Sequence, residues 1–267
     1  MRFFDNIKRF YKENNKKTLT IYIFLRILVI ISMIWQIIRQ NWNNVFLCVL
    51  TLILFAIPYF LDKKFKITLP TVLETIILLF IFSAEILGEI QNFYGIFKHW
   101  DTILHTMNGF LCAAIGFSLI DILNQNEKIH IYLSPIFVAL VAFCFSMTVG
   151  VLWEFFEFGA DTFFETDMQK DRILTNISTV TLHPEGKNIP IKIDNIHNTV
   201  INYTDDKGEE VSKIVEGGYL DIGIIDTMKD LLVNFVGAIV FSFIGYLYIK
   251  NRDKYKFAEE FMPRTRK

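Results

Sequence analysis

Ionisable residues lie inside several long apolar segments of this 267-residue chain, in four pairs that could act together. Within each pair the residues are three or four positions apart, so on a helix they share one face. Burying an unpaired charge in a bilayer is costly, so such residues indicate a functional site. The pairs are Glu85 with Glu89, Asp101 with His105, Glu154 with Glu157, and Asp226 with Asp230.

Carboxylates and an imidazole that project inward from neighbouring helices form the ligand set of divalent metals in helical bundles. Oxygen ligands with one histidine nitrogen suit Zn, Mn, Fe or Mg better than metals that prefer sulfur. The sequence therefore predicts a metal or proton site. Its predicted members are His105, Glu154, Glu157, Asp226 and Asp230, supported by Glu85, Glu89, Asp101 and Asp161.

Two other interpretations of these residues stay open. Carboxylates crowded in a low dielectric repel one another, so some would be protonated at neutral pH, as in a proton relay or a cation-coupled transporter. Acids at helix ends can instead reach water and favour the helix dipole, as Asp101 and Asp226 would at the start of their segments. The residues thus predict where a site lies. They do not identify catalytic residues, and whether the chain is an enzyme stays open.

The elements that position these residues are six apolar runs of about 20 residues, the length that crosses about 30 Å of hydrocarbon. The chain is 52% hydrophobic and holds 27 Phe, concentrated in these runs. We therefore predict an all-α membrane protein with six transmembrane helices in contact with the lipid bilayer. The runs cover residues 19–38, 44–61, 70–92, 102–123, 132–158 and 225–249.

Basic residues flank the runs unequally. Six Lys or Arg precede the first run, Lys63, Lys64 and Lys66 follow the second, and seven lie from Lys250 onward. By the positive-inside rule both termini are predicted to be cytoplasmic, although the loop at 124–131 offers only Lys128. The first run is too long for the apolar part of a signal peptide, so a retained helix is expected.

Residues 160–223 form a long polar stretch that this topology places outside the cytoplasm. Strand-like runs at 173–182, 189–193 and 199–203, with turn signals at 183–186 and 205–208, predict a small β-rich cap of two to four strands. The predicted division of the chain is a basic cytoplasmic arm (1–18), helices one to five (19–159), an extracytoplasmic cap (160–223), helix six (224–249) and a basic cytoplasmic tail (250–267).

Further intramembrane charges lie near the predicted cytoplasmic side. Arg26 and Glu74 are hypothesised to form an ion pair across two helices, although Arg26 could instead reach the headgroups. Zinc-protease, serine-hydrolase, Walker A and dinucleotide-binding signatures are all absent, so no cofactor-binding motif is predicted. Nothing indicates a nucleic-acid partner. The three cysteines fall inside apolar runs and are interpreted as small buried hydrophobes: Cys48, Cys112 and Cys144.

Three stretches resemble the YjdF-type family of bacterial inner-membrane proteins, a domain of unknown function. They are HWDTILHTMNGF (99–110), WEFFEFGAD (153–161) and GIIDTMKDLLVNFVGA (223–238). The Asp-x-x-x-His pattern at 101–105 is also similar to VanZ-like membrane proteins. The resemblance implies a multi-pass protein of the bacterial cytoplasmic membrane and carries no known activity. Residues matching the family pattern are Asp101, His105, Trp153, Glu154, Glu157, Asp226 and Asp230.

The leading functional hypothesis is an outer-face site for a divalent cation or protons, with metal-dependent hydrolysis of an envelope or lipid-linked substrate as its enzymatic form. A proton- or cation-coupled transporter is the first alternative. The second is a non-catalytic binding or assembly module, in which residues 170–216, less typical of the resembled family, meet an extracytoplasmic partner or substrate. The sequence does not predict the oligomeric state.

Overall fold

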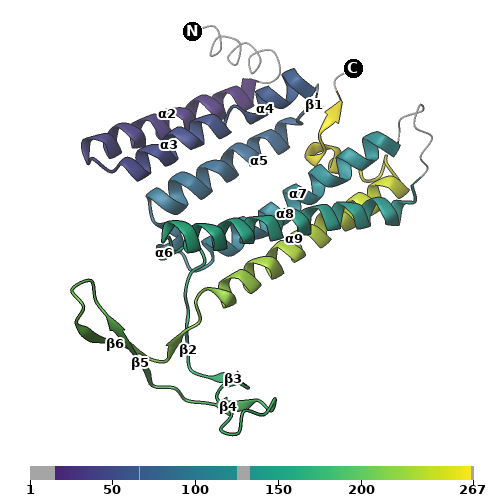
Figure 1. Cartoon of the computed structure of the whole chain (residues 1–267). Helices are drawn as coiled ribbons and strands as arrows, with labels where there is room; N and C mark the ends of the chain where they lie inside the picture. The colour runs from purple at the N-terminus through teal and green to yellow at the C-terminus, as the bar shows by residue number, and fades with distance from the viewer. Residues whose placement is uncertain (1–15, 66, 125–132, 266–267) are drawn as a thin grey trace. The chain divides into compact units, whose positions relative to one another are not determined.

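The computed structural model describes residues 16–65, 67–124 and 133–265 (Figure 1). The start of the basic arm and Lys128 lie outside the described residues. Within these residues six helical segments are long and apolar enough to span a membrane, which confirms the predicted six-helix class. The segments are Thr18–Ile38, Trp42–Phe60, Thr71–Ile90, Trp100–Leu123, Pro135–Phe164 and Ile224–Lys250.

The chain divides into two compact units, which are described separately: Met1–Val151 with Asp230–Lys267, and Leu152–Lys229. The first unit begins with α2 (Lys16–Ile38) and α3 (Trp42–Leu54), followed by the short α4 (Ile57–Phe60), the π-helix η1 (Leu61–Phe65) and strand β1 (Ile67–Thr68). The second span is broken after Leu54 because Pro58 has no amide hydrogen to donate to the preceding turn.

The third span is part α-helix and part π-helix. Helix α5 (Thr71–Phe82) continues as the π-helix η2 (Ser83–Ile90), and the single turn α6 (Phe93–Ile96) follows. Helices α2, α3 and α5 lie side by side (Figure 1) around a core that includes Tyr22, Cys48 and Leu78. Cys48 is therefore a buried hydrophobe, as predicted. Cys144 is exposed instead, because it lies on an outer helix face where lipid rather than protein would cover it.

A second core joins α7 (Trp100–Asn124), α8 (Pro135–Phe164) and α9 (Ile224–Lys250). After α9 the chain folds back through the 3-10 helix η3 (Lys256–Phe261), and strand β8 (Arg264–Thr265) pairs antiparallel with β1. Ala258 and Met262 are buried in this second core. The segment after Lys250 is thus packed against the helices over residues 255–262.

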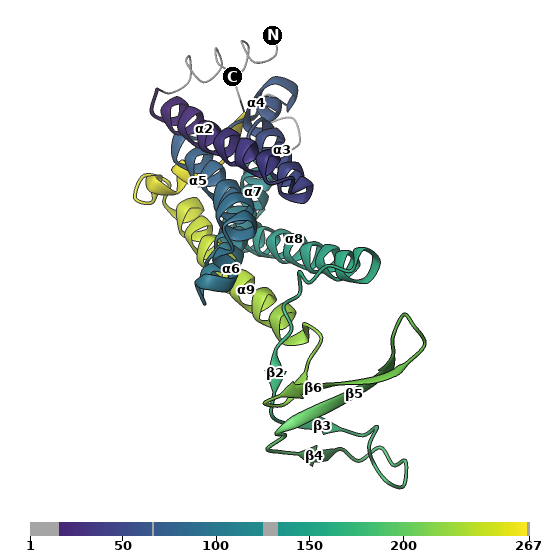
Figure 2. The same cartoon turned by 90° about the vertical axis from the view of Figure 1, so that its left-hand side faces the viewer.

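Between α8 and α9 six short strands form three separate antiparallel pairs (Figure 2). Strands β2 (Ile173–Leu174) and β7 (Tyr219–Leu220) pair, as do β3 (Ile177–Thr179) and β4 (Ile191–Ile193). Strands β5 (Asn198–Thr204) and β6 (Glu210–Glu216) form a seven-residue hairpin. The predicted β-rich insertion is confirmed.

Two details of the predicted insertion are wrong. The run 173–182 is two strands with different partners, not one. Strand β6 was not expected, because Glu210, Lys213 and Glu216 interrupt its apolar alternation. The turn at 205–208 is present, and the amide of Gly208 donates to the carbonyl oxygen of Asp205 at 3.0 Å. The insertion therefore holds six strands rather than two to four.

Candidate cation site

The start of helix α7 is fixed against the π-helical end of the third span. The indole Nε1 of Trp100 donates to the carbonyl oxygen of Ser83 at 3.3 Å, at the point where η2 begins. The Trp100 ring also packs edge-on against Phe93, with centroids 4.9 Å apart. Because π-helical turns frequently mark functional sites, this anchoring beside Asp101 is notable. It fixes the first turn of α7, where Asp101 lies.

Two glycines bring α7 and α9 into backbone contact. A Cβ on Gly109 would lie 2.8 Å from the carbonyl carbon of Asn234, and one on Gly237 would lie 2.8 Å from the amide nitrogen of Phe110. Small residues at such positions let membrane helices approach closely. The approach brings Asp230, one turn before Asn234, against His105, one turn before Gly109.

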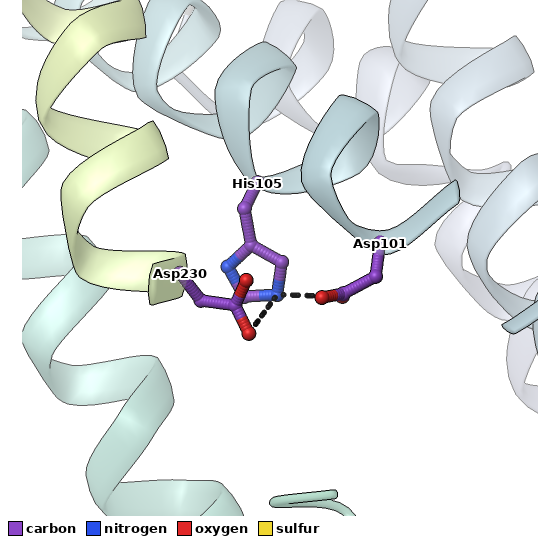
Figure 3. Close-up of side chains that lie close together, drawn as sticks. All are labelled: Asp101, His105 and Asp230. Carbon is purple, nitrogen blue, oxygen red and sulfur yellow. Dashed lines mark ion pairs between the residues drawn. The ribbon is translucent and has the colours of Figure 1, made fainter. Parts of the chain in front are cut away.

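Asp101, His105 and Asp230 form one group, whose ligand atoms all lie within 4.8 Å of one another. Nε2 of His105 is 3.3 Å from Oδ1 of Asp101 and 3.9 Å from Oδ2 of Asp230. Both carboxylates point toward this nitrogen (Figure 3). The Asp230 side chain is 3% exposed, that of His105 13% and that of Asp101 25%. The group is therefore accessible from the side of Asp101 and covered by protein on the side of Asp230.

These separations suit ligands around a shared ion. Ligand atoms about 2.1 Å from one metal ion, at tetrahedral or octahedral angles, lie roughly 3.0–3.5 Å from each other. The Asp101–His105 distance falls in that range, and the His105–Asp230 distance exceeds it by a few tenths of an ångström, which side-chain rotation can close. Nε2 carries one proton or one lone pair, so it cannot satisfy two carboxylates by itself.

A polar layer lies one turn deeper, between α7, α8 and α9. Nδ2 of Asn108 donates to Oδ1 of Asn234 at 3.3 Å, and Nδ2 of Asn234 reaches the carbonyl oxygen of Ser146 at 3.5 Å. Oγ of Ser146 donates to the carbonyl oxygen of Gly109 at 2.7 Å. Asn234 is buried and contacts both other helices. It therefore fixes the rotation of α9 and, with it, the position of Asp230.

Below this layer the three helices are packed with apolar side chains. Ala113, Phe117, Ala238 and Phe241 have no exposed surface, and the Phe110 and Phe241 rings pack edge to face at 4.9 Å. These apolar side chains separate the polar layer from the buried polar groups nearer the other end of the helices, Ser118, Ser242 and Asp121. Among the described residues of this unit the site is closed on its inner side.

The other predicted acids have different surroundings. Asp226 is buried and accepts hydrogen bonds from the Lys170 amide and from the Arg172 guanidinium, each at 3.2 Å. Nζ of Lys229 lies 3.7 Å from it. Asp161 accepts from the Met168 amide at 2.7 Å. In the second unit these two carboxylates therefore hold the segment that follows α8.

Asp221 was missed by sequence reasoning. It is buried and accepts hydrogen bonds from the amides of Arg172 at 2.7 Å, Ile225 at 2.9 Å and Gly223 at 3.2 Å. Burial by itself would raise the pKa of this carboxyl, but the backbone donors outweigh it and hold the pKa below its ordinary value. Its only sequence signal is its position just before a helix start, next to Gly223.

The lowered pKa of Asp221 predicts acid sensitivity at the base of the insertion. Its stabilising contribution is complete above the unfolded pKa of about 3.9 and is lost as pH falls through the lower folded value. We expect hydrogen-exchange protection of the Arg172 and Ile225 amides, corrected for intrinsic rates, to hold at pH 5 and to decrease below about pH 4. Asp221→Asn should decrease protection at pH 5, and Asp167→Asn, an exposed control, should not. Unchanged protection in Asp221→Asn would contradict the assignment.

Glu154 and Glu157 lie on the protein-facing side of α8. Both are buried, and Nε1 of Trp153 donates to Oε1 of Glu157 at 2.8 Å. The exposed residues of the same turns are aromatic, including Phe155, Phe156 and Phe158. A helix with buried acids and an exposed aromatic face is the reverse of a water-soluble amphipathic helix, which favours a position in the bilayer. Their membership of the site stays a prediction.

The remaining predicted residues are placed elsewhere in the first unit. Glu85 is half-buried and Glu89 is exposed, both within η2. Arg26 donates to the hydroxyl of Tyr22, one turn earlier on α2. Glu74 is buried in the first turn of α5. The Arg26–Glu74 ion pair stays a prediction.

A family model described as "Predicted membrane protein (DUF2238)" matches residues 21–251. The match spans all six membrane helices and includes Asp101, His105 and Asp230. No curated protein and no solved structure matches the chain.

Proposed function

The chain belongs to the DUF2238 family of predicted membrane proteins, and we propose that it binds a divalent cation through Asp101, His105 and Asp230. The observation that carries this proposal is the convergence of two carboxylates on one imidazole nitrogen, with Asp230 almost fully buried. With a neutral imidazole the group has a formal charge of −2. A divalent cation neutralises it, whereas one added proton leaves −1.

A site with three protein ligands leaves coordination positions for water or a substrate, as catalytic metal sites do. The reaction class that fits a site near the end of a membrane span is metal-assisted hydrolysis of a lipid-linked or envelope substrate. A bound cation would supply Lewis acidity and an activated water. The protein side chains would hold it and, through Asn234 and the close glycines, keep the ligands together.

Orientation is part of the proposal. The site lies at the start of α7, and the basic residues Lys250, Lys254 and Lys256 lie at or after the end of α9. Because α7 and α9 run parallel, with Asp230 beside His105 at their starts and Arg252 beside Asp121 at their ends, the basic residues are at the opposite end of the bundle from the site. By the positive-inside rule this supports an outer-face site in a bacterial cytoplasmic membrane.

The same rule supports the predicted division of the chain, with cytoplasmic termini and an extracytoplasmic insertion. The YjdF-type resemblance of residues 99–110, 153–161 and 223–238 is compatible with a family of membrane proteins and stays part of the proposal. The transporter alternative requires a polar path away from the site. The closed apolar packing around Phe117 and Phe241 favours a site that opens on one side.

Metal analysis of the purified protein tests the cation site. We expect near-stoichiometric Zn, Mn or Fe after supply of each metal, and a rise in the unfolding temperature on metal addition because a ligand that binds only the folded state stabilises it. His105→Ala should weaken binding by about 100-fold, roughly 2.8 kcal/mol. His99→Ala is the matched control, since His99 is exposed and outside the group.

Absence of bound metal after supply of Zn, Mn, Fe and Mg in turn, with no change in unfolding temperature, would remove the cation site. Equal loss of binding in His99→Ala and His105→Ala would move the site elsewhere.

A further inference from the structure

The insertion between α8 and α9 has no hydrophobic core of its own. Between Asp161 and Gly237, the only apolar residues that are buried are glycines. Its three strand pairs are all two-stranded. An isolated two-stranded hairpin is at best marginally stable in water, because it buries too little surface to offset the entropy of ordering. The hairpin β5–β6 therefore has a structural reason to gain another strand.

The two strands of this hairpin differ in how their outer edges are protected. Strand β6 carries Glu210, Lys213 and Glu216, and charged side chains are a usual protection against edge pairing. Strand β5 reads NTVINYT and has no charge, no proline and no glycine over seven residues. Among the residues that the structure describes, it is bonded as a strand only to β6. Strand β5 is thus the unprotected edge.

We propose that strand β5 pairs with β5 of a second copy of this chain, in an antiparallel arrangement centred on Ile201. The pairing joins two hairpins into a four-stranded sheet. Two-fold pairing places Thr199 opposite Tyr203 and Val200 opposite Asn202, and it places Ile201 opposite its symmetry mate. Side chains directly opposite one another in an antiparallel pair stabilise the sheet when they are apolar, β-branched or aromatic.

Charge argues for a β5 pair rather than a β6 pair. The same two-fold operation on β6, centred on Lys213, places Glu210 opposite Glu216 and Lys213 opposite Lys213. Like charges directly opposite are destabilising. On β5 no charge meets another. Val200 and Ile201 are 52% and 43% exposed in the single chain, so the pairing also covers apolar surface.

Cysteine cross-linking in the full-length protein tests the pairing. Ile201 and Lys213 are direct neighbours in the hairpin register, so they lie on the same face and at the same level, one on each edge. In a Cys144→Ser background, Ile201→Cys should form an intermolecular disulfide under mild oxidation in liposomes, because residues directly opposite in antiparallel strands have Cα atoms about 4.5–5.5 Å apart. Lys213→Cys is the matched control and should stay largely monomeric.

A second variant keeps the test independent of disulfide chemistry. Ile201→Lys puts two lysines opposite one another, so the dimer seen by light scattering in detergent should dissociate, while the cation content of the protein stays unchanged. Cross-linking of Lys213→Cys equal to or above that of Ile201→Cys would overturn the proposal, as would a monomeric wild-type protein. A dimer that survives Ile201→Lys, or an adduct of Ile201→Cys with a different protein, would also overturn it.

Discussion

Gly237→Ala is expected to destabilise the protein and weaken cation binding, although alanine is the better helix former. A Cβ at this position meets the backbone of α7 at Thr106 and Phe110, and backbone atoms cannot rotate away as a side chain can. Overpacking costs typically 1–3 kcal/mol, which exceeds the roughly 1 kcal/mol that alanine gains over glycine in a helix. The two helices must separate, and Asp230 then moves away from His105.

Gly159→Ala is the matched control for this prediction. Gly159 lies in helix α8, and nothing would lie within 4 Å of its added Cβ. The same chemical change there should leave stability unchanged or raise it by up to about 1 kcal/mol. Unfolding in denaturing detergent measures the stability, and metal titration measures the affinity. We expect cation affinity to fall by about 10-fold or more in Gly237→Ala, as with other changes outside the first ligand shell.

Gly237→Ala must be clearly less stable than Gly159→Ala for the interpretation to hold. Equal stability of Gly237→Ala and Gly159→Ala would mean that α7 and α9 do not depend on close backbone contact. Loss of stability with normal cation affinity in Gly237→Ala would separate helix packing from the position of Asp230. Either result would contradict the role assigned to the glycines.

The helices were predictable from the sequence because the bilayer imposes one simple rule. Each apolar run had to be about 20 residues long, and all six runs are helices within a few residues of their predicted bounds. The fifth run was the least accurate. It continues to Phe164 rather than 158, since the aromatic residues after Glu157 extend the helix past the polar positions that suggested its end.

The partners of each acid were much less predictable. Asp101 and His105 share a face by spacing alone, but only the packing of α9 against α7 selects Asp230 as the third member. Asp226 is also an aspartate and lies four positions before Asp230. It nevertheless accepts a hydrogen bond from Arg172, a residue 54 positions away along the chain. Helix spacing is a local signal. It cannot report which loop folds back onto a helix end.

Asp121 illustrates the same limit at the other end of α7. By sequence it resembles a solvated helix end, but it is buried and accepts two hydrogen bonds from Arg252, at 2.7 and 3.2 Å. The pair forms because the segment after α9 folds back and buries Ala258 and Met262. Nothing in the charge pattern distinguishes Arg252 from the other basic residues near it.

Asp230→Asn is expected to have opposite effects on binding and on the stability of the metal-free protein. Removing one ligand charge should weaken cation affinity by about 100-fold or more, roughly 2.8 kcal/mol. When the imidazole is neutral, the metal-free group holds two carboxylates within 4.8 Å of each other. Their repulsion is about 3 kcal/mol at an effective dielectric of about 20, and replacing one with an amide relieves it. The metal-free variant should therefore be more stable, by about 1–3 kcal/mol.

Asp121→Asn provides the control because the chemical change and the burial are similar. Asp121 is 6% exposed and Asp230 is 2% exposed. Asp121 faces a cation, so its replacement removes the charge-assisted hydrogen bonds from the half-exposed Arg252, which keeps its bond to Tyr248, and should cost about 1–3 kcal/mol. The unfolding free energies of both variants, measured at pH 8 after the metal is removed by a chelator, show whether each substitution stabilises or destabilises the protein. If Asp230→Asn also destabilises the metal-free protein, its carboxylate serves the fold rather than a cation. A cation-binding site keeps carboxylates that lower the stability of the metal-free protein, because their repulsion is offset only when the cation is bound.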